Sequence, residues 1–225
     1  MKTKSLLQIL YEDPHLFAMQ KPPRMACVPA SHIPIQETVL GKIQWMFAKK
    51  GIQPYLLHRL DAQTSGVLLF GKHAKDREAL EGIFRSPETH KKYTALVKGV
   101  PHGRMITVPL PARASKEKIP AQTDFRILEI FPVPPCALVE AEIKTGRKHQ
   151  IRQHFAGIGC PIILDSRYGD ERFNRRFRIA FRLGRQFLHA KSIAFSHPML
   201  KKQIFIEAPL PPDLQSVLKK LRLGK

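Results

Sequence analysis

A carboxylate beside two basic side chains occurs in residues 58–61, which read His58-Arg59-Leu60-Asp61. Asp61 is the only acid there, and a carboxylate held in place acts as a nucleophile or as an electrostatic partner for a developing charge. Thr-Ser-Gly at 64–66 is typical of a turn, and Val67–Phe70 has the length and composition of a buried strand. The alternative is a surface loop in which Arg59 and Asp61 form a weak ion pair, worth about 0–1 kcal/mol.

A second candidate, Tyr93, lies in residues 91–99, whose alternating pattern predicts a strand. Tyr93, Ala95 and Val97 share one face of that strand because successive side chains point to opposite sides. On these residues alone, Tyr93 would be a core tyrosine.

A third group of polar side chains lies in residues 145–155, which predict the start of a helix. Its buried stripe is Ile151, Phe155 and Ile158, with Arg152 at the edge of that stripe. The predicted first turn is crowded with Arg147, Lys148 and His149. Cations there are disfavoured by about 0.3–1 kcal/mol each, so these residues either offer charge to a ligand or form a solvated basic helix end.

Metal and nucleotide cofactors are not expected. His149 and His154 fall on different faces of a helix, and no carboxylate or thiolate lies at ligand spacing. The chain also lacks the glycine-rich phosphate-binding and dinucleotide-binding patterns.

The charge balance points to a polyanionic partner. The 225 residues include 38 Lys and Arg against 18 Asp and Glu, a formal net charge of +20, spread along the whole chain. Nucleic acid or an anionic membrane surface fits this excess. No apolar run approaches the ~18 residues of a membrane span. Cys27, Cys136 and Cys160 are too few and too scattered for a disulfide framework, so we expect a reduced, cytoplasmic setting.

The elements that must position these residues follow from periodicity. Strands are predicted at 7–12, 15–19, 123–131, 137–144 and 204–207, and helices at 36–50, 74–84 and 213–221. The first of these helices is predicted to bury Val39, Ile43, Trp45, Met46 and Phe47, and the second Ala79, Leu80, Ile83 and Phe84. Residues 172–185 contain six arginines interspersed with Phe173, Phe177 and Phe181. If this segment is a helix, the phenylalanines face the protein core and the arginines face outward, where they could contact phosphate. No linker divides the chain, which predicts one domain over residues 1–225.

Four stretches resemble the RluA-type pseudouridine synthases. The first is His-Arg-Leu-Asp-x-x-Thr-Ser-Gly at 58–66, and the second is Lys-x-Tyr-x-Ala-x-Val-x-Gly at 91–99. The third, Gly-Arg-x-His-Gln-Ile-Arg-x-His, lies at 146–154. The fourth, at 159–169, departs from the family pattern at Cys160, where His is usual, and at Leu164, where Gly is usual.

The resemblance implies an α+β fold: a single mixed, mainly antiparallel sheet with flanking helices and a central catalytic cleft. It also implies an isomerase that converts uridine to pseudouridine in RNA without a cofactor. We expect a monomer that binds RNA but no membrane, and that has no separate N-terminal RNA-binding domain. The substrate would be tRNA, with rRNA nearly as well supported. A non-catalytic RNA-binding or ribosome-assembly protein of the same fold is the alternative, and a metal-dependent nuclease is a weaker one.

The resemblance also assigns roles. Asp61 would be catalytic and paired with Arg152, and Tyr93 would stack on a uracil flipped out of the RNA. Whether Asp61 attacks the ribose or the base stays open. The residues expected to bind substrate are Arg59, His58, Arg147, His149, Arg175 and Arg176.

Overall fold

The computed structural model describes residues 7–112 and 117–224. Its internal contacts divide the chain into two compact units. Unit 1 comprises Met1–His90 and Ala190–Pro209, and unit 2 comprises Lys91–His189 and Leu210–Lys225. The expectation that the chain is one catalytic domain stays a prediction.

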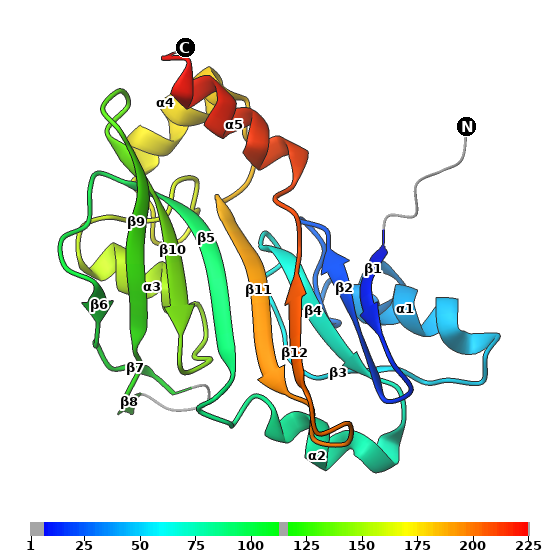
Figure 1. The fold of residues 1–225 in the computed structure, drawn as a ribbon. Coiled ribbons are helices and arrows are strands. Elements are labelled where there is room, and N and C mark those ends of the chain that lie inside the picture. Colours follow the sequence, from blue (N-terminus) through cyan, green and yellow to red (C-terminus); the bar gives the residue numbers. More distant parts are fainter. Residues whose placement is uncertain (1–6, 113–116, 225) are drawn as a thin grey trace. The chain divides into compact units, whose positions relative to one another are not determined.

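Unit 1 is built on antiparallel strand pairs (Figure 1). Its strand order is β1-β2-β4-β11-β12, and the short β3 also pairs with β4. The bounds are β1 Gln8–Glu12, β2 Leu16–Lys21, β3 Tyr55–Leu56, β4 Ser65–Gly71, β11 Leu188–Ser196 and β12 Gln203–Glu207. A turn at Asp13 joins β1 to β2, and the Asp13 carboxylate accepts hydrogen bonds from the backbone N–H groups of His15 (2.7 Å) and Leu16 (2.9 Å).

Helix α1 (Val39–Ala48) covers β2 in unit 1. A short 3-10 turn, Ile35–Glu37, precedes it, and the Thr38 side chain caps it by accepting from the Gly41 N–H. Phe47 stacks on Phe17 of β2 at 4.7 Å between ring centroids. The prediction that Trp45 is buried was wrong: its side chain is 80% exposed, because the helix turns it away from the face that carries Ile43 and Phe47.

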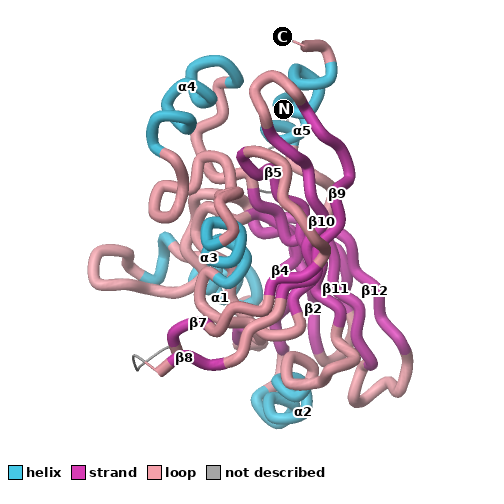
Figure 2. The backbone as a smooth tube through the Cα atoms, turned by 90° about the vertical axis from the view of Figure 1, so that its left-hand side faces the viewer, coloured by secondary structure: helices cyan, strands magenta, loops and turns pink. Residues whose placement is uncertain are grey.

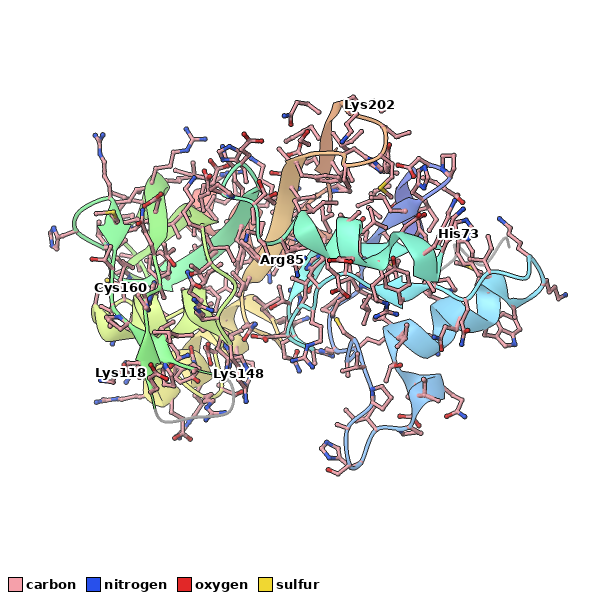
Figure 3. All side chains as sticks on the ribbon, turned by 90° about the horizontal axis from the view of Figure 1, so that it is seen from below. His73, Arg85, Lys118, Lys148, Cys160 and Lys202 are labelled. Carbon is pink, nitrogen blue, oxygen red and sulfur yellow. The ribbon has the colours of Figure 1, made fainter. Side chains whose placement is uncertain are left out.

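Helix α2 (Arg77–Gly82) follows a 3-10 turn at Ala74–Asp76. In Figure 3 the labelled His73 and Arg85 mark the two ends of this segment. Leu80 and Ile83 are buried as predicted. Ala79 is exposed, so the predicted inward face was too wide.

The sheet of unit 2 has the strand order β5-β10-β9-β6, with antiparallel pairs. The bounds are β5 His90–Lys98, β6 Met105–Ile106, β9 Thr123–Phe131 and β10 Cys136–Ile143, and β7 (Leu110–Pro111) pairs with β8 (Lys118–Ile119) as a separate ribbon. Because β6 pairs only with Thr123 and Asp124, the remainder of β9 forms an outer edge among the described strands. Three apolar side chains on this edge are exposed: Ile127, Leu128 and Ile130.

Helices cover both faces of the unit 2 sheet. Helix α3 (Gln150–Gly157) packs on the face that carries Ala95 and Val97. Helices α4 (Glu171–Phe181) and α5 (Pro212–Arg222) share a core with Leu96 and Leu138 on the other face. Figure 2 shows these helices in cyan beside the magenta strands. The predicted orientation of the α4 phenylalanines is confirmed, since Phe177 and Phe181 are buried and Phe173 packs against them. The predicted α+β architecture is likewise confirmed.

Gly66, at the start of β4, generates the first test of the fold. Its φ is +124°, which side chains rarely adopt, and a Cβ atom there would overlap the carbonyl of Ala190 on β11. We therefore expect Gly66→Ala to lower the free energy of unfolding by more than the ~1 kcal/mol of a mean substitution. Urea denaturation followed by circular dichroism measures the change.

Gly82→Ala is the matched control in the same unit, because a Cβ atom at Gly82 has nothing within 4 Å and the residue is helical. We expect it to be neutral or stabilising by up to about 1 kcal/mol. Equal losses in the two variants would contradict the close approach of β4 and β11.

Candidate active site

The Asp61 loop, residues 57–64, leads directly into β4, every residue of which is buried. The N–H of Leu57 donates to the carbonyl of Leu69 (3.0 Å), and the N–H of Thr64 donates to the carbonyl of Asp61 (3.0 Å). Asp61 is half-buried and Arg59 is exposed. The loop therefore holds a carboxylate at a fixed point of unit 1 while leaving part of it open to solvent.

Lys21 supports this loop from beneath and was missed as a site residue. It is the last residue of β2 and is fully buried. Its ammonium donates to the carbonyls of Ala62 (3.0 Å) and Pro22 (2.7 Å). A lysine that ends an apolar strand was the available signal, since a buried cation must find acceptors.

Cys27 connects the Asp61 loop to a second segment of unit 1. Its thiol donates to the carbonyl of Leu60 (3.2 Å) and accepts from the Leu60 N–H (3.4 Å). Burial raises the pKa of this thiol, the charge of Lys21 lowers it, and the charge of Asp61 raises it. Lys21 and Asp61 therefore both lie within electrostatic reach of one sulfur atom.

His58 is held by the protein itself. Its Nε2 accepts from the Leu69 N–H (3.1 Å), and its ring stacks on Phe84 at 4.6 Å between centroids. These contacts fix the start of the Asp61 loop. Contact between His58 and a substrate stays a prediction.

Tyr93 lies on β5 opposite Ala141 of β10. Its side chain packs against the core cluster that contains Ala95 and Val97, yet the residue is only half-buried. It is thus neither sealed in the core nor fully exposed. Part of its surface is open to solvent in unit 2.

Arg152 of α3 makes a buried ion pair that the sequence did not predict. Its Nε and Nη2 donate to the two carboxylate oxygens of Asp165, at 2.7 and 2.9 Å. The two side chains are 9% and 0% exposed. The Arg152 guanidinium has five N–H donors, of which this bidentate pair uses two. The predicted pairing of Arg152 with Asp61 stays a prediction.

Asp165 is the centre of a tight turn. Its carboxylate also accepts from the backbone N–H groups of Arg167 (2.9 Å) and Tyr168 (3.0 Å). Burial would raise the pKa of Asp165, but the hydrogen bonds from Arg152 and the backbone outweigh it and lower the pKa. The Asn174 amide of α4 donates to the Asp165 carbonyl (3.0 Å), so the turn is tied to α4 as well.

The ring of Tyr168 extends this network. The Arg152 guanidinium lies 5.2 Å from its ring centroid, and Nδ1 of His149 lies 3.2 Å from its hydroxyl. The structure thereby connects Arg152 and His149, both predicted from the sequence, through Tyr168, which was not.

The start of α3 differs from the prediction. The helix begins at Gln150, and His149 before it is left-handed with a φ of 54°. Arg147 and Lys148 therefore precede the helix instead of crowding its first turn. The Gln150 side chain closes the preceding turn, since its Oε1 accepts from the Arg147 N–H (3.1 Å). Ile158 is 38% exposed instead of buried, because the helix has already ended at Gly157.

Leu164, which stands where the family pattern usually has Gly, adopts a left-handed backbone conformation. Its φ is +62°, a region in which glycine is the default and a bulky side chain is uncommon. Leu164 is buried in the core beneath α4, and its N–H donates to the Asn174 side chain (2.7 Å). Packing and this hydrogen bond hold the left-handed turn without a glycine.

Helix α4 presents a face of exposed arginines, here termed the α4 arginine face. Its members are Arg172, Arg175, Arg176, Arg178 and Arg182. The two that the sequence predicted to bind substrate, Arg175 and Arg176, are thus on the surface of unit 2.

Among the described residues, 7–112 and 117–224, no three His, Cys, Asp or Glu side chains gather where they could hold a metal ion. In the same part of the chain, no helix has the length and apolar character needed to cross a bilayer.

Comparison with known proteins gives a consistent family. The model of the RNA pseudouridylate synthase family matches residues 15–157. Ribosomal large subunit pseudouridine synthase C of Vibrio cholerae is 37% identical over 228 residues, covering 95% of this chain and 69% of that protein. The Escherichia coli protein of the same name is 36% identical over 229 residues, covering 95% and 70%. Among solved structures, human RNA Pseudouridylate Synthase Domain Containing 4 has the same fold, with a TM-score of 0.78 at 24% identity over 96% of this chain and 93% of that one.

The Arg152–Asp165 pair generates a test of stability. Asp165→Asn leaves the Arg152 guanidinium buried without its counter-charge, so we expect a loss of about 3–5 kcal/mol in the free energy of unfolding at neutral pH. The folded-state pKa of Asp165 is lowered, so its contribution is present above the unfolded pKa of about 3.9 and is lost as the pH falls through the folded pKa. The difference between wild type and variant should therefore shrink on acidification.

The double variant Arg152→Met with Asp165→Leu serves as the control, because it removes both charges. We expect it to be more stable than Asp165→Asn alone. A double variant as unstable as the single one would mean that the loss of unfolding free energy arises from the turn backbone and not from an Arg152 guanidinium without its counter-charge.

Proposed function

The chain belongs to the RNA pseudouridylate synthase family, and from this premise we propose that it uses Asp61 to isomerise a uridine of large-subunit ribosomal RNA. The observation that carries the proposal is the Asp61 loop, which holds one half-buried carboxylate between a buried strand and a buried cation. The reaction breaks the bond between the base and the ribose, turns the base and rejoins it through carbon 5. This isomerisation needs no net input of atoms or electrons.

Asp61 is proposed as the catalytic carboxylate. A carboxylate that attacks or stabilises a cationic centre must stay ionised, and burial works against ionisation. Lys21 lies behind the Asp61 loop, where its ammonium donates to the carbonyl of Ala62 (3.0 Å) and holds the loop backbone in place. From the family resemblance, Arg152 is proposed to pair with Asp61.

The uridine must leave its stack before this chemistry can occur. Flipping costs a few kcal/mol, and an aromatic face that receives the base offsets part of it. Tyr93 is proposed to supply that face, since its ring is held by β5 but remains partly open. Arg59, which is exposed and lies two residues before Asp61, is proposed to hold the flipped nucleotide or to fill the space that it leaves.

Ribosomal RNA is preferred to tRNA because of the relatives. The Vibrio cholerae and Escherichia coli proteins, both named for the large ribosomal subunit, match 95% of this chain at 37% and 36% identity. The tRNA expectation rested on a local likeness around residues 167–176, which is a much shorter match.

The proposal is tested by mapping pseudouridine in total rRNA and tRNA. The comparison is made in cells that lack the gene and are complemented with wild type or Asp61→Asn. We expect one or a few uridines of large-subunit rRNA to lose modification in the Asp61→Asn cells, because the amide cannot form or stabilise the covalent intermediate.

Asp124→Asn, which changes a half-buried carboxylate of unit 2, is the matched control and should restore modification. Full modification with Asp61→Asn would favour a non-catalytic RNA-binding protein. Loss of tRNA sites alone would move the proposed substrate to tRNA.

The α4 arginine face is proposed to contact RNA phosphates. In the double variant Arg175→Gln with Arg176→Gln, we expect weaker RNA binding and a log–log salt slope reduced by about 1.4–1.8, because two phosphate contacts are lost. Filter binding of rRNA at several salt concentrations measures the slope. Arg222→Gln is the control, since Arg222 is already paired with Glu129 at 2.8 Å, and its slope should not change.

A further inference from the structure

Trp45 is the most exposed of the large hydrophobic side chains among the described residues, at 80%. It is also the single tryptophan of the chain. The apolar side of α1 is already occupied, since Val39, Ile43 and Phe47 are buried in unit 1. The Trp45 ring lies on the opposite side of the helix and takes no part in the core.

Lysines flank this ring on the same helical face. Lys42 and Lys49 lie three residues before and four residues after Trp45, the spacings at which helical side chains are neighbours. Both are exposed, and in the described part of the chain no carboxylate forms an ion pair with either. The chain has no acid between Glu37 and Asp61. The α1 outer face, defined as Lys42, Trp45 and Lys49, thus joins an open aromatic ring to uncompensated positive charge.

We propose that the α1 outer face binds a single-stranded segment of RNA, with one unpaired base stacked on Trp45 and its phosphates on Lys42 and Lys49. This combination is the one used by proteins that bind single strands, in which base stacking on an aromatic ring contributes about 1–3 kcal/mol. The inference rests on the proposed function only in taking RNA as the polyanion. The stacked base is distinct from the uridine that is isomerised.

Other occupants fit the face less well. A second copy of this chain carries the same charge of +20 and is repelled. Insertion into a membrane requires a helix with a free apolar face, whereas that of α1 is buried against β2.

The position of α1 relates this site to the Asp61 loop within unit 1. The N–H groups of Val39 and Leu40 donate to the carbonyls of Ala26 (2.9 Å) and Cys27 (3.2 Å). Cys27 is in turn bonded to Leu60, next to Asp61. Trp45 lies about 9 Å along the helix axis from Val39, at 1.5 Å per residue. The helix that carries Trp45 is thus connected to the Asp61 loop through Cys27 within unit 1.

The single tryptophan makes the proposal directly measurable. Fluorescence of the full-length Asp61→Asn protein is followed during titration with oligouridylate, and in parallel with the same strand paired to oligoadenylate. We expect saturable quenching of Trp45 by the single strand and weaker quenching by the duplex, whose bases are already stacked. Because Asp61→Asn is inactive under the proposed function, the result does not depend on catalysis.

Variants separate stacking from charge, with affinity for labelled oligouridylate as the readout. Trp45→Ala should weaken binding about 5- to 150-fold, and Trp45→Phe much less. Replacing both Lys42 and Lys49 by Gln should reduce the salt slope by about 1.4. Phe205→Ala is the matched control, since Phe205 is a 65% exposed aromatic of unit 1 with Gln203 and Glu207 beside it on β12, and it should bind as wild type does.

Three results would overturn the proposal. One is unquenched fluorescence at saturating RNA, and another is unchanged affinity in Trp45→Ala. The third is emission that responds to protein concentration alone, which would identify a second copy as the occupant. None of these three results would affect the Asp61→Asn mapping experiment. The two proposals can therefore fail separately.

Discussion

The buried pair between Arg152 and Asp165 organises unit 2. A guanidinium and a carboxylate taken out of water are stable only when their hydrogen-bonding groups are largely satisfied. Asp165 meets this demand with two N–H donors from Arg152 and two from the backbone of the turn that follows. Helix α3, this turn and helix α4 are consequently held in one arrangement, with a guanidinium of fixed orientation between them.

Unit 1 positions its acid by a different principle. Backbone hydrogen bonds to β4, a buried ammonium and the Cys27 thiol hold the Asp61 loop. These contacts hold main-chain atoms and so restrict the loop without requiring its carboxylate. A loop held through its main chain in this way keeps a constant position in unit 1.

Periodic patterns predicted the strands and most helix faces well, since the 2.0 and 3.6 residue repeats arise directly from backbone geometry. They failed where a neighbour decides the outcome. Trp45 was counted as core because it is apolar, but the direction of a side chain depends on which helix face meets the sheet. The predicted start of α3 was too early. The Gln150 side chain closes the turn before the helix and His149 is left-handed, so the helix begins only at Gln150. Asp165 was missed because its partner lies on another element, which no local pattern shows. For the candidate site, the motif identified Asp61, Tyr93 and Arg152 as residues of interest, while their roles remain proposals.

The uncovered stretch of β9 shows what else the charge of this protein does. A strand edge with exposed Ile127, Leu128 and Ile130 is the kind of surface on which identical chains add to one another and precipitate. Each copy carries a formal net charge of +20, so two copies repel one another over a distance set by the ionic strength. The lysines and arginines thus serve colloidal stability as well as affinity for a polyanion, and the protein is safest from aggregation in dilute salt.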